Sequence, residues 1–300
     1  MTEITLLDGS IGQELVNRAG DRPTPLWSTQ VMLDRPELVR QVHEAYFAAG
    51  ATVATTNTYP VLRDRLTRAG LQTRVADLHA AAVTAARAAR DAAGAGRVAG
   101  AIGPLGASYR PDLCPPVADA VRLYGEPIRH LRDHVDLLAF ETMASLEQAE
   151  GALVAARTHG GDLPVWLALT VEDSDGTRLR SGEKLARLAP LIKRHAPAAV
   201  LINCSPPEVI GDALDIIRDF GRPFGAYANG FTRIGAGFLK EAPTVDALTA
   251  RSDLDPAAYA DFAMGWVARG ATIVGGCCEV GPDHITELAR RLRAAGHRIV

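Results

Sequence analysis

The stretch Ala-Thr-Ile-Val-Gly-Gly-Cys-Cys at residues 271–278 decides how this 300-residue chain folds. A short apolar run, typical of a buried strand, ends in two glycines and two adjacent cysteines. A second apolar run at residues 198–202 ends in a similar way, at Asn203-Cys204-Ser205. Thiols that follow separate strands converge only if those strands end on the same side of one sheet. A closed parallel barrel has this property, so these two stretches favour a barrel.

The three strand-end thiols of Cys204, Cys277 and Cys278 are candidate zinc ligands. Neighbours on a strand point to opposite faces, so the adjacent cysteines reach one centre only where the strand ends and the backbone turns. Gly275 and Gly276 allow the backbone to turn there, because glycine adopts backbone conformations that other residues rarely adopt. Three cysteine sulfurs leave one tetrahedral position open, which is the arrangement of a catalytic rather than a structural zinc.

The alternative for each thiol taken singly is an inert core residue, because cysteine is among the most buried residue types. We interpret Cys114 in this way. The N-terminal sequence lacks a cationic segment leading into a long apolar stretch, and no apolar run approaches the length of a membrane span. We therefore expect a cytoplasmic protein without membrane contact, whose four cysteines are thiols or metal ligands rather than disulfides.

Composition favours a single catalytic domain over residues 1–300. A hydrophobic content of 47% is enough for a large core, and one barrel uses about 250 residues or more. The net charge of −3, with basic residues spread along the chain, gives no footprint for nucleic acid. Small-molecule partners are expected, and no heptad or apolar stripe indicates an oligomeric state.

Outward from the two cysteine stretches, brief apolar runs alternate with segments of helical spacing along the whole chain. Helix starts are marked by proline in the first turn, as at Pro36 and Pro282. Eight alternations predict an α/β fold, a (β/α)8 TIM barrel. The predicted strands are residues 4–9, 52–59, 98–104, 135–143, 164–171, 198–205, 223–229 and 272–278. Two longer connections, residues 108–116 and 231–253, are candidate functional loops.

Sites in this fold lie at the carboxyl ends of the strands, where the sequence places two acids, Asp8 and Glu141. Carboxylates in this position suit a substrate ammonium. The alternative for each is a loop or cap acid that accepts backbone N–H groups.

Several motifs together resemble the homocysteine S-methyltransferase family, and the match spans nearly the whole chain. The pairing of Asn203-Cys204 with a later Gly-Gly-Cys-Cys is the most specific of them. The others include Leu7-Asp8-Gly9-Ser10-Ile11-Gly12, Pro25-Leu26-Trp27-Ser28, Thr56-Asn57-Thr58-Tyr59, Ile102-Gly103-Pro104, Glu141-Thr142 and His284-Ile285.

The resemblance implies a Zn²⁺ ion held by Cys204, Cys277 and Cys278, with the homocysteine sulfur in the fourth position. It also implies that the amino-acid end of homocysteine is held by Asp8, Gly9 and Glu141. Further candidate substrate contacts are Asn203, Trp27 and Tyr59.

Simple ligand counting supports this chemistry, since three thiolates on a zinc dication leave a bound substrate thiolate electron-rich and nucleophilic. The methyl donor then needs a cationic leaving group, and aromatic faces suit such a cation. Trp27, Tyr59 and Tyr109 are the aromatic candidates. We favour S-methylmethionine or another small sulfonium as the donor that converts homocysteine to methionine, with betaine second.

Three departures from the family pattern bear on the donor: Ala228-Asn229-Gly230-Phe231 after the seventh strand, Glu279 after the cysteine pair, and the loop at 108–115 with Arg110. Two other function classes stay open. A zinc held by three cysteines can activate water for hydrolysis, although no strand-end histidine is placed as a base. The chain could also bind zinc or a metabolite without catalysis.

Overall fold

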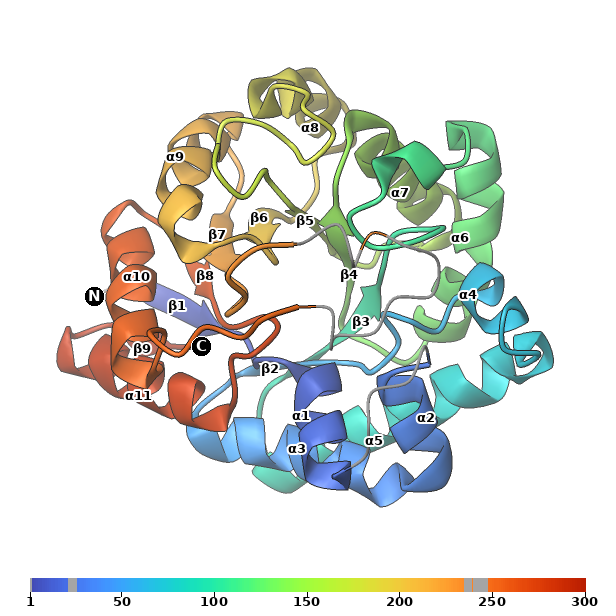
Figure 1. Cartoon of the computed structure of the whole chain (residues 1–300), viewed down its shortest axis with the longest axis horizontal. Coiled ribbons are helices and arrows are strands. Elements are labelled where there is room, and N and C mark those ends of the chain that lie inside the picture. Colours follow the sequence, from blue (N-terminus) through green and yellow to red (C-terminus); the bar gives the residue numbers. More distant parts are fainter. Residues whose placement is uncertain (1, 21–25, 235–238, 240–247) are drawn as a thin grey trace.

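The computed structural model describes residues 2–20, 26–234, 239 and 248–300, and the fold is a parallel barrel surrounded by helices (Figure 1). Its sheet has the order β2-β3-β4-β5-β6-β7-β8-β1-β9, and all its ladders are parallel. The strands are β1 (Glu3–Leu6), β2 (Val53–Thr55), β3 (Arg97–Ile102), β4 (Leu137–Met143), β5 (Val165–Leu169), β6 (Ala199–Asn203), β7 (Phe224–Tyr227), β8 (Ile273–Val274) and β9 (Arg298–Ile299).

The barrel closes between β1 and β2, where Leu7 forms a parallel bridge with Val53. Two backbone hydrogen bonds join the same segments, from Thr52 N to Leu6 O at 2.7 Å and from Asp8 N to Val53 O at 3.2 Å. The predicted TIM-barrel class is therefore confirmed.

The helices lie outside the barrel and cover its strands (Figure 1). Helices that begin at a predicted proline do so as expected, because proline is pre-organised for the first turn and needs no N–H partner there. The α-helices as a whole are α1 (Ile11–Ala19), α2 (Ser28–Asp34), α3 (Pro36–Ala49), α4 (Arg63–Thr67), α5 (Val75–Ala93), α6 (Val117–Leu131), α7 (Leu146–His159), α8 (Ala189–His195), α9 (Pro207–Ile217), α10 (Pro256–Ala268) and α11 (Pro282–Ala294).

All eight predicted strands are present, and each is shorter than predicted. The sequence analysis missed β9, which pairs with the start of β1 through Glu3 and Arg298. This strand is two residues long and carries a charged side chain, so it leaves no apolar run in the sequence. Residues 235–238 and 240–247 of the predicted loop at 231–253 lie outside the described residues.

Strand alternation places the site residues inside the barrel. On β4, Leu137 and Ala139 belong to the cluster of side chains that fills the barrel interior, so Glu141, two residues on, continues the inward-facing row. Leu201 and Asn203 are related in the same way on β6. In the described part of the chain, no helix is long and apolar enough to cross a membrane.

Candidate active site

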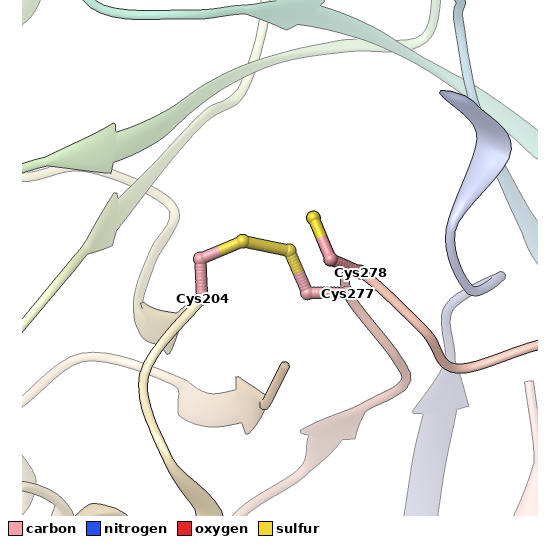
Figure 2. Close-up of side chains that lie close together, drawn as sticks. All are labelled: Cys204, Cys277 and Cys278. Atoms are coloured by element: carbon pink, nitrogen blue, oxygen red, sulfur yellow. A yellow bond between two sulfur atoms is a disulfide. The ribbon is translucent and has the colours of Figure 1, made fainter. Parts of the chain in front are cut away.

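The three predicted ligand cysteines converge at the carboxyl ends of β6 and β8. Their sulfur atoms all lie within 4.8 Å of one another. Figure 2 shows Cys204 and Cys277 joined by a disulfide, with the Cys278 side chain beside them as a free thiol. Strand β7 lies between the two segments and holds both backbones, since Cys204 N donates to Tyr227 O at 3.2 Å and Cys277 N donates to Ala228 O at 2.9 Å.

The expectation that all four cysteines are thiols or metal ligands is wrong for two of them in this structure. Cys204 and Cys277 are 73 residues apart in sequence, yet their Cα atoms are 5.7 Å apart, within the range that a disulfide spans. Sulfur atoms that the ends of β6 and β8 bring together to share one metal can also bond to each other directly. Cys114 is a half-buried free thiol outside this group, as predicted.

The donor set fits zinc once the disulfide is reduced. Thiolates bound tetrahedrally at about 2.3 Å from zinc are separated by roughly 3.8 Å. The three sulfurs already lie within 4.8 Å of one another, so once the disulfide is broken small side-chain movements would bring them to that spacing. Burial raises the pKa of the Cys278 thiol to about 12. A thiolate at this position therefore requires a cation beside it, which a metal ion would supply.

The two predicted acids line the same cavity, which has a volume of about 370 Å³. Asp8 is buried and accepts hydrogen bonds from Thr55, with Oδ2 2.6 Å from the backbone N and Oδ1 3.0 Å from the hydroxyl. Burial raises the pKa of Asp8 well above its ordinary value, against the effect of these bonds, and the nearby Glu141 charge raises it further. The backbone contact predicted by the alternative reading of Asp8 is thus present.

Glu141 is the second carboxylate of the cavity. Its Oε1 accepts a hydrogen bond of 2.8 Å from the hydroxyl of Tyr227, and burial raises its pKa to about 7. Neither acid forms an ion pair with a basic side chain of the described residues. Two adjacent acids with raised pKa values and no cationic partner suit a ligand ammonium, which would stabilise both charges.

Gly9 is required by the close approach of two chain segments. A Cβ at this position would lie 2.1 Å from Val280 O and 2.9 Å from the ring of Tyr46. Val280 closes the turn after the cysteine pair, through a hydrogen bond of 3.1 Å from its N to Cys277 O. Gly9 therefore lets the acid-bearing end of β1 pack directly against the cysteine segment.

Asn203 lines the cavity, but both ends of its amide are already bonded to Thr142. Oδ1 accepts from Thr142 N and Nδ2 donates to Thr142 Oγ1, each at 3.0 Å. Thr142 has a φ of 63°, a left-handed conformation that costs energy for a β-branched residue. The amide thus holds the strand end that follows Glu141 in its strained conformation.

The aromatic candidates differ in what covers their rings. The Arg65 guanidinium lies 5.3 Å from the ring centroid of Tyr59, and that of Arg180 lies 4.9 Å from the ring centroid of Tyr109. Trp27 also lines the cavity, and its buried indole N–H has no hydrogen-bond partner among the described residues. Arginines of the chain thus already occupy a face of both tyrosine rings.

Left-handed backbone is concentrated at this end of the barrel. Among the described non-glycine residues with positive φ, four line the cavity and one follows Cys278 directly, whereas Ala196 lies elsewhere. Strained backbone of this kind clusters at functional sites. The five are Trp27, Tyr109, Thr142, Cys204 and Glu279.

Sequence reasoning missed several residues of the cavity. Tyr227, next to the strand-end segment at 228–230, could have been found by including the last inward-facing position of each strand. Arg65 lies on the short helix α4 and Arg68 directly follows it, and only the folded structure brings them to the cavity.

A family model described as homocysteine S-methyltransferase matches residues 5–292 of the chain. The chain belongs to the homocysteine S-methyltransferase family. The match covers strands β2 to β8, the end of β1, the paired acids and the cysteine segments described above, so it includes the whole candidate site.

Curated homocysteine S-methyltransferase relatives match along nearly their whole length. The Escherichia coli homocysteine S-methyltransferase is 32% identical, with 96% of this chain and 95% of the relative covered. Homocysteine S-methyltransferase YbgG of Bacillus subtilis is 27% identical, with 97% and 95% covered. Selenocysteine methyltransferase of Astragalus bisulcatus is 28% identical, with 93% and 90% covered.

The homocysteine methyltransferase MmuM of E. coli has been solved in forms that bear on the cysteines. Its metallated form superposes with a TM-score of 0.80 at 29% identity, and its oxidized form with a TM-score of 0.80 at 28% identity. Both comparisons cover 96% of each chain. The family fold is thus known in a metal-bound and in an oxidized state.

Proposed function

We propose that this protein transfers a methyl group from a cationic donor, S-methylmethionine or a related sulfonium, to the thiol of homocysteine, and so forms methionine. The observation that carries the proposal is one cavity that combines three convergent cysteine sulfurs with two carboxylates that form no ion pair with any described basic residue. The thiols suit a metal-activated sulfur, and the acids suit the ammonium of an amino acid.

We assign Cys204, Cys277 and Cys278 as ligands of a Zn²⁺ ion in the reduced protein. When bound, zinc would lower the pKa of the homocysteine thiol and hold it as a nucleophilic thiolate. Glu141 and Asp8 would bind the ammonium group of homocysteine and fix the position of its sulfur. Gly9 and Asn203 would keep these acids and the cysteines in register.

The reaction balances without a general base. The homocysteine sulfur forms a new S–C bond to the methyl group as the donor S–CH3 bond breaks. The electron pair of the broken bond stays on the donor sulfur, which changes from a sulfonium to a neutral thioether. Positive charge is lost at the donor as negative charge is lost at the acceptor, so a water-poor cavity favours the transfer.

The test uses reduced, zinc-loaded protein with homocysteine and a panel of donors, with methionine detected by mass spectrometry. We expect methionine from S-methylmethionine and none from an uncharged thioether such as methionine bearing a labelled methyl group. If methionine forms only from betaine, the methyl donor is a quaternary ammonium and not a sulfonium. Methionine formed only from a methyl folate, or rapid hydrolysis of an ester without a thiol, would refute the proposal.

A further inference from the structure

The cavity has two sides of opposite charge. The cysteine side carries the only lining carboxylates among the described residues, Asp8 and Glu141. The other side, here called the α4 side, is formed by Leu26, Trp27, Thr29, Arg65, Arg68 and Ser108. It carries two arginines, and within the described chain neither forms an ion pair with an acid.

Arg65 is held in place while part of its hydrogen-bonding capacity is unused. Its Nη2 donates to Pro104 O at 2.7 Å, and its guanidinium lies over the Tyr59 ring. Its Nη1 forms no hydrogen bond with a described residue and is not buried, so this nitrogen is free for a ligand. Arginine presents a planar fork of donors that matches a carboxylate, so an ordered and incompletely bonded arginine at a cavity indicates an anionic ligand.

We propose that the α4 side binds a carboxylate of the methyl donor, with Arg65 as the main contact and Arg68 in support. This inference rests on the proposed methyl transfer and narrows the donor to cations that also carry a carboxylate. Two arginines without counter-ions repel a simple cation such as trimethylsulfonium. A donor carboxylate directed at the arginines turns that repulsion into attraction, which gives specificity as well as affinity. In S-methylmethionine the same carbon also bears an ammonium, which would have to point away from the arginines.

The carboxylate of homocysteine does not fit this role. It is attached to the carbon that bears the ammonium, so an acceptor held at Asp8 and Glu141 keeps its carboxylate on the cysteine side. Tyr59 marks the boundary between the two sides, because its hydroxyl pairs with Ser108 at 2.6 Å while it also interacts with Thr142 and Glu141. The α4 side is left for the donor.

The test compares S-methylmethionine with its carboxamide, in which the carboxylate is replaced by a neutral group of similar size. In Arg65→Gln we expect the KM for S-methylmethionine to rise about 10- to 150-fold, the range for losing a charge-assisted hydrogen bond. The KM for the carboxamide and that for homocysteine should change little. Arg65→Lys should recover part of the loss, because it keeps the charge.

Arg63→Gln is the matched control. Arg63 lies on the same helix, is exposed, pairs with Glu126 and does not line the cavity. Equal losses for both donors in Arg65→Gln would assign Arg65 a purely structural role through Pro104 and overturn the proposal. A raised homocysteine KM would also overturn it, since the arginine would then serve the acceptor.

A calorimetric titration of the protein with S-methylmethionine, without homocysteine, separates this inference from the proposed function. If the wild type forms no methionine but binds S-methylmethionine, and if the binding weakens both in Arg65→Gln and with the carboxamide, the proposed function fails and the carboxylate site stands. If binding of the two ligands is equal in wild type and variant, the carboxylate site fails.

Discussion

The hydroxyl of Tyr227 donates a hydrogen bond of 2.8 Å to Oε1 of Glu141, across the mouth of the barrel from β7 to β4. This bond orients the carboxylate and favours its charged form, whereas burial favours the neutral form and prevails, raising the pKa of Glu141 to about 7. Glu141 therefore ionises readily when a cation binds beside it.

Glu141→Gln should weaken homocysteine binding about 10- to 150-fold, because it removes a charge-assisted hydrogen bond of roughly 1.5–3 kcal/mol. Steady-state kinetics should show a raised KM for homocysteine with unchanged zinc content. A thiol acceptor that lacks the amino group serves as the control and should lose much less. Equal losses for both acceptors would remove Glu141 from ammonium recognition.

The same substitution should stabilise the substrate-free protein at alkaline pH. The pKa of Glu141 is about 7 in the folded chain, above its ordinary value of 4.5. Its contribution to stability is thus fully present below pH 4.5 and is lost as the pH rises through 7. In urea unfolding at equal zinc loading, Glu141→Gln should gain up to about 3 kcal/mol over the wild type at pH 8.5 and little at pH 4.5. A difference independent of pH would contradict this.

His43 should make the protein sensitive to acid. It is fully buried on α3, both ring nitrogens lack partners, and burial lowers its pKa to about 4 from 6.5. The unfolded chain binds this proton first, so stability falls as the pH drops from 6.5 through 4, by up to about 3 kcal/mol. His43→Leu should reduce that loss in pH-dependent unfolding. The exposed His134→Leu is the control and should leave the acid limb unchanged.

Single replacement of Cys204, Cys277 or Cys278 by Ser should lower the zinc content of the reduced protein and abolish turnover, because each removes one of three ligands. Metal analysis after reduction measures this directly. Cys114→Ser should keep about one zinc per chain. Full zinc occupancy in Cys277→Ser would exclude the three-thiolate site.

Gly9→Ala should disturb the metal site from a position that touches no sulfur. The added Cβ would meet Val280 O at 2.1 Å, and relief of that overlap displaces the turn after the cysteine pair. We expect a loss of about 1–3 kcal/mol in stability together with lower zinc content. Gly265→Ala is the matched control, since a Cβ at that position in α10 meets no atom within 4 Å. It should be neutral or stabilising, as expected for alanine in a helix.

The barrel and its site were predictable to different extents. Apolar runs such as residues 198–202 gave the strands, because parallel strands buried on both faces need continuous apolar sequence. The convergence of Cys204 with Cys277 and Cys278 followed from the barrel, in which all strand ends meet at one face. Strand β9 was not predictable, since its pairing with β1 depends on backbone groups rather than on side-chain pattern.

The oxidation state of the cysteines and the make-up of the α4 side could be learned only from the structure. Whether Cys204 and Cys277 are ligands or a disulfide depends on the distance between their strand ends, which no sequence spacing reports. Arg65 belongs to a five-residue helix with no motif, and its place beside Tyr59 comes from the path of the chain after β2. Asn203 lines the cavity as the prediction of a substrate contact requires, and its bonds to Thr142 join two strands in a way that no sequence pattern reports.

The positions of the residues with left-handed backbone indicate where a substitution can raise the stability of this enzyme. Ala196 has a φ of 46° at the end of α8, away from the cavity, so Ala196→Gly would release about 1 kcal/mol of backbone strain without touching the mouth of the barrel. The same change at Thr142 or Cys204 would also relax the chain, but it would delete a side chain that organises the cavity. Thermal stability and catalytic turnover can therefore be altered by substitutions at separate positions of this fold.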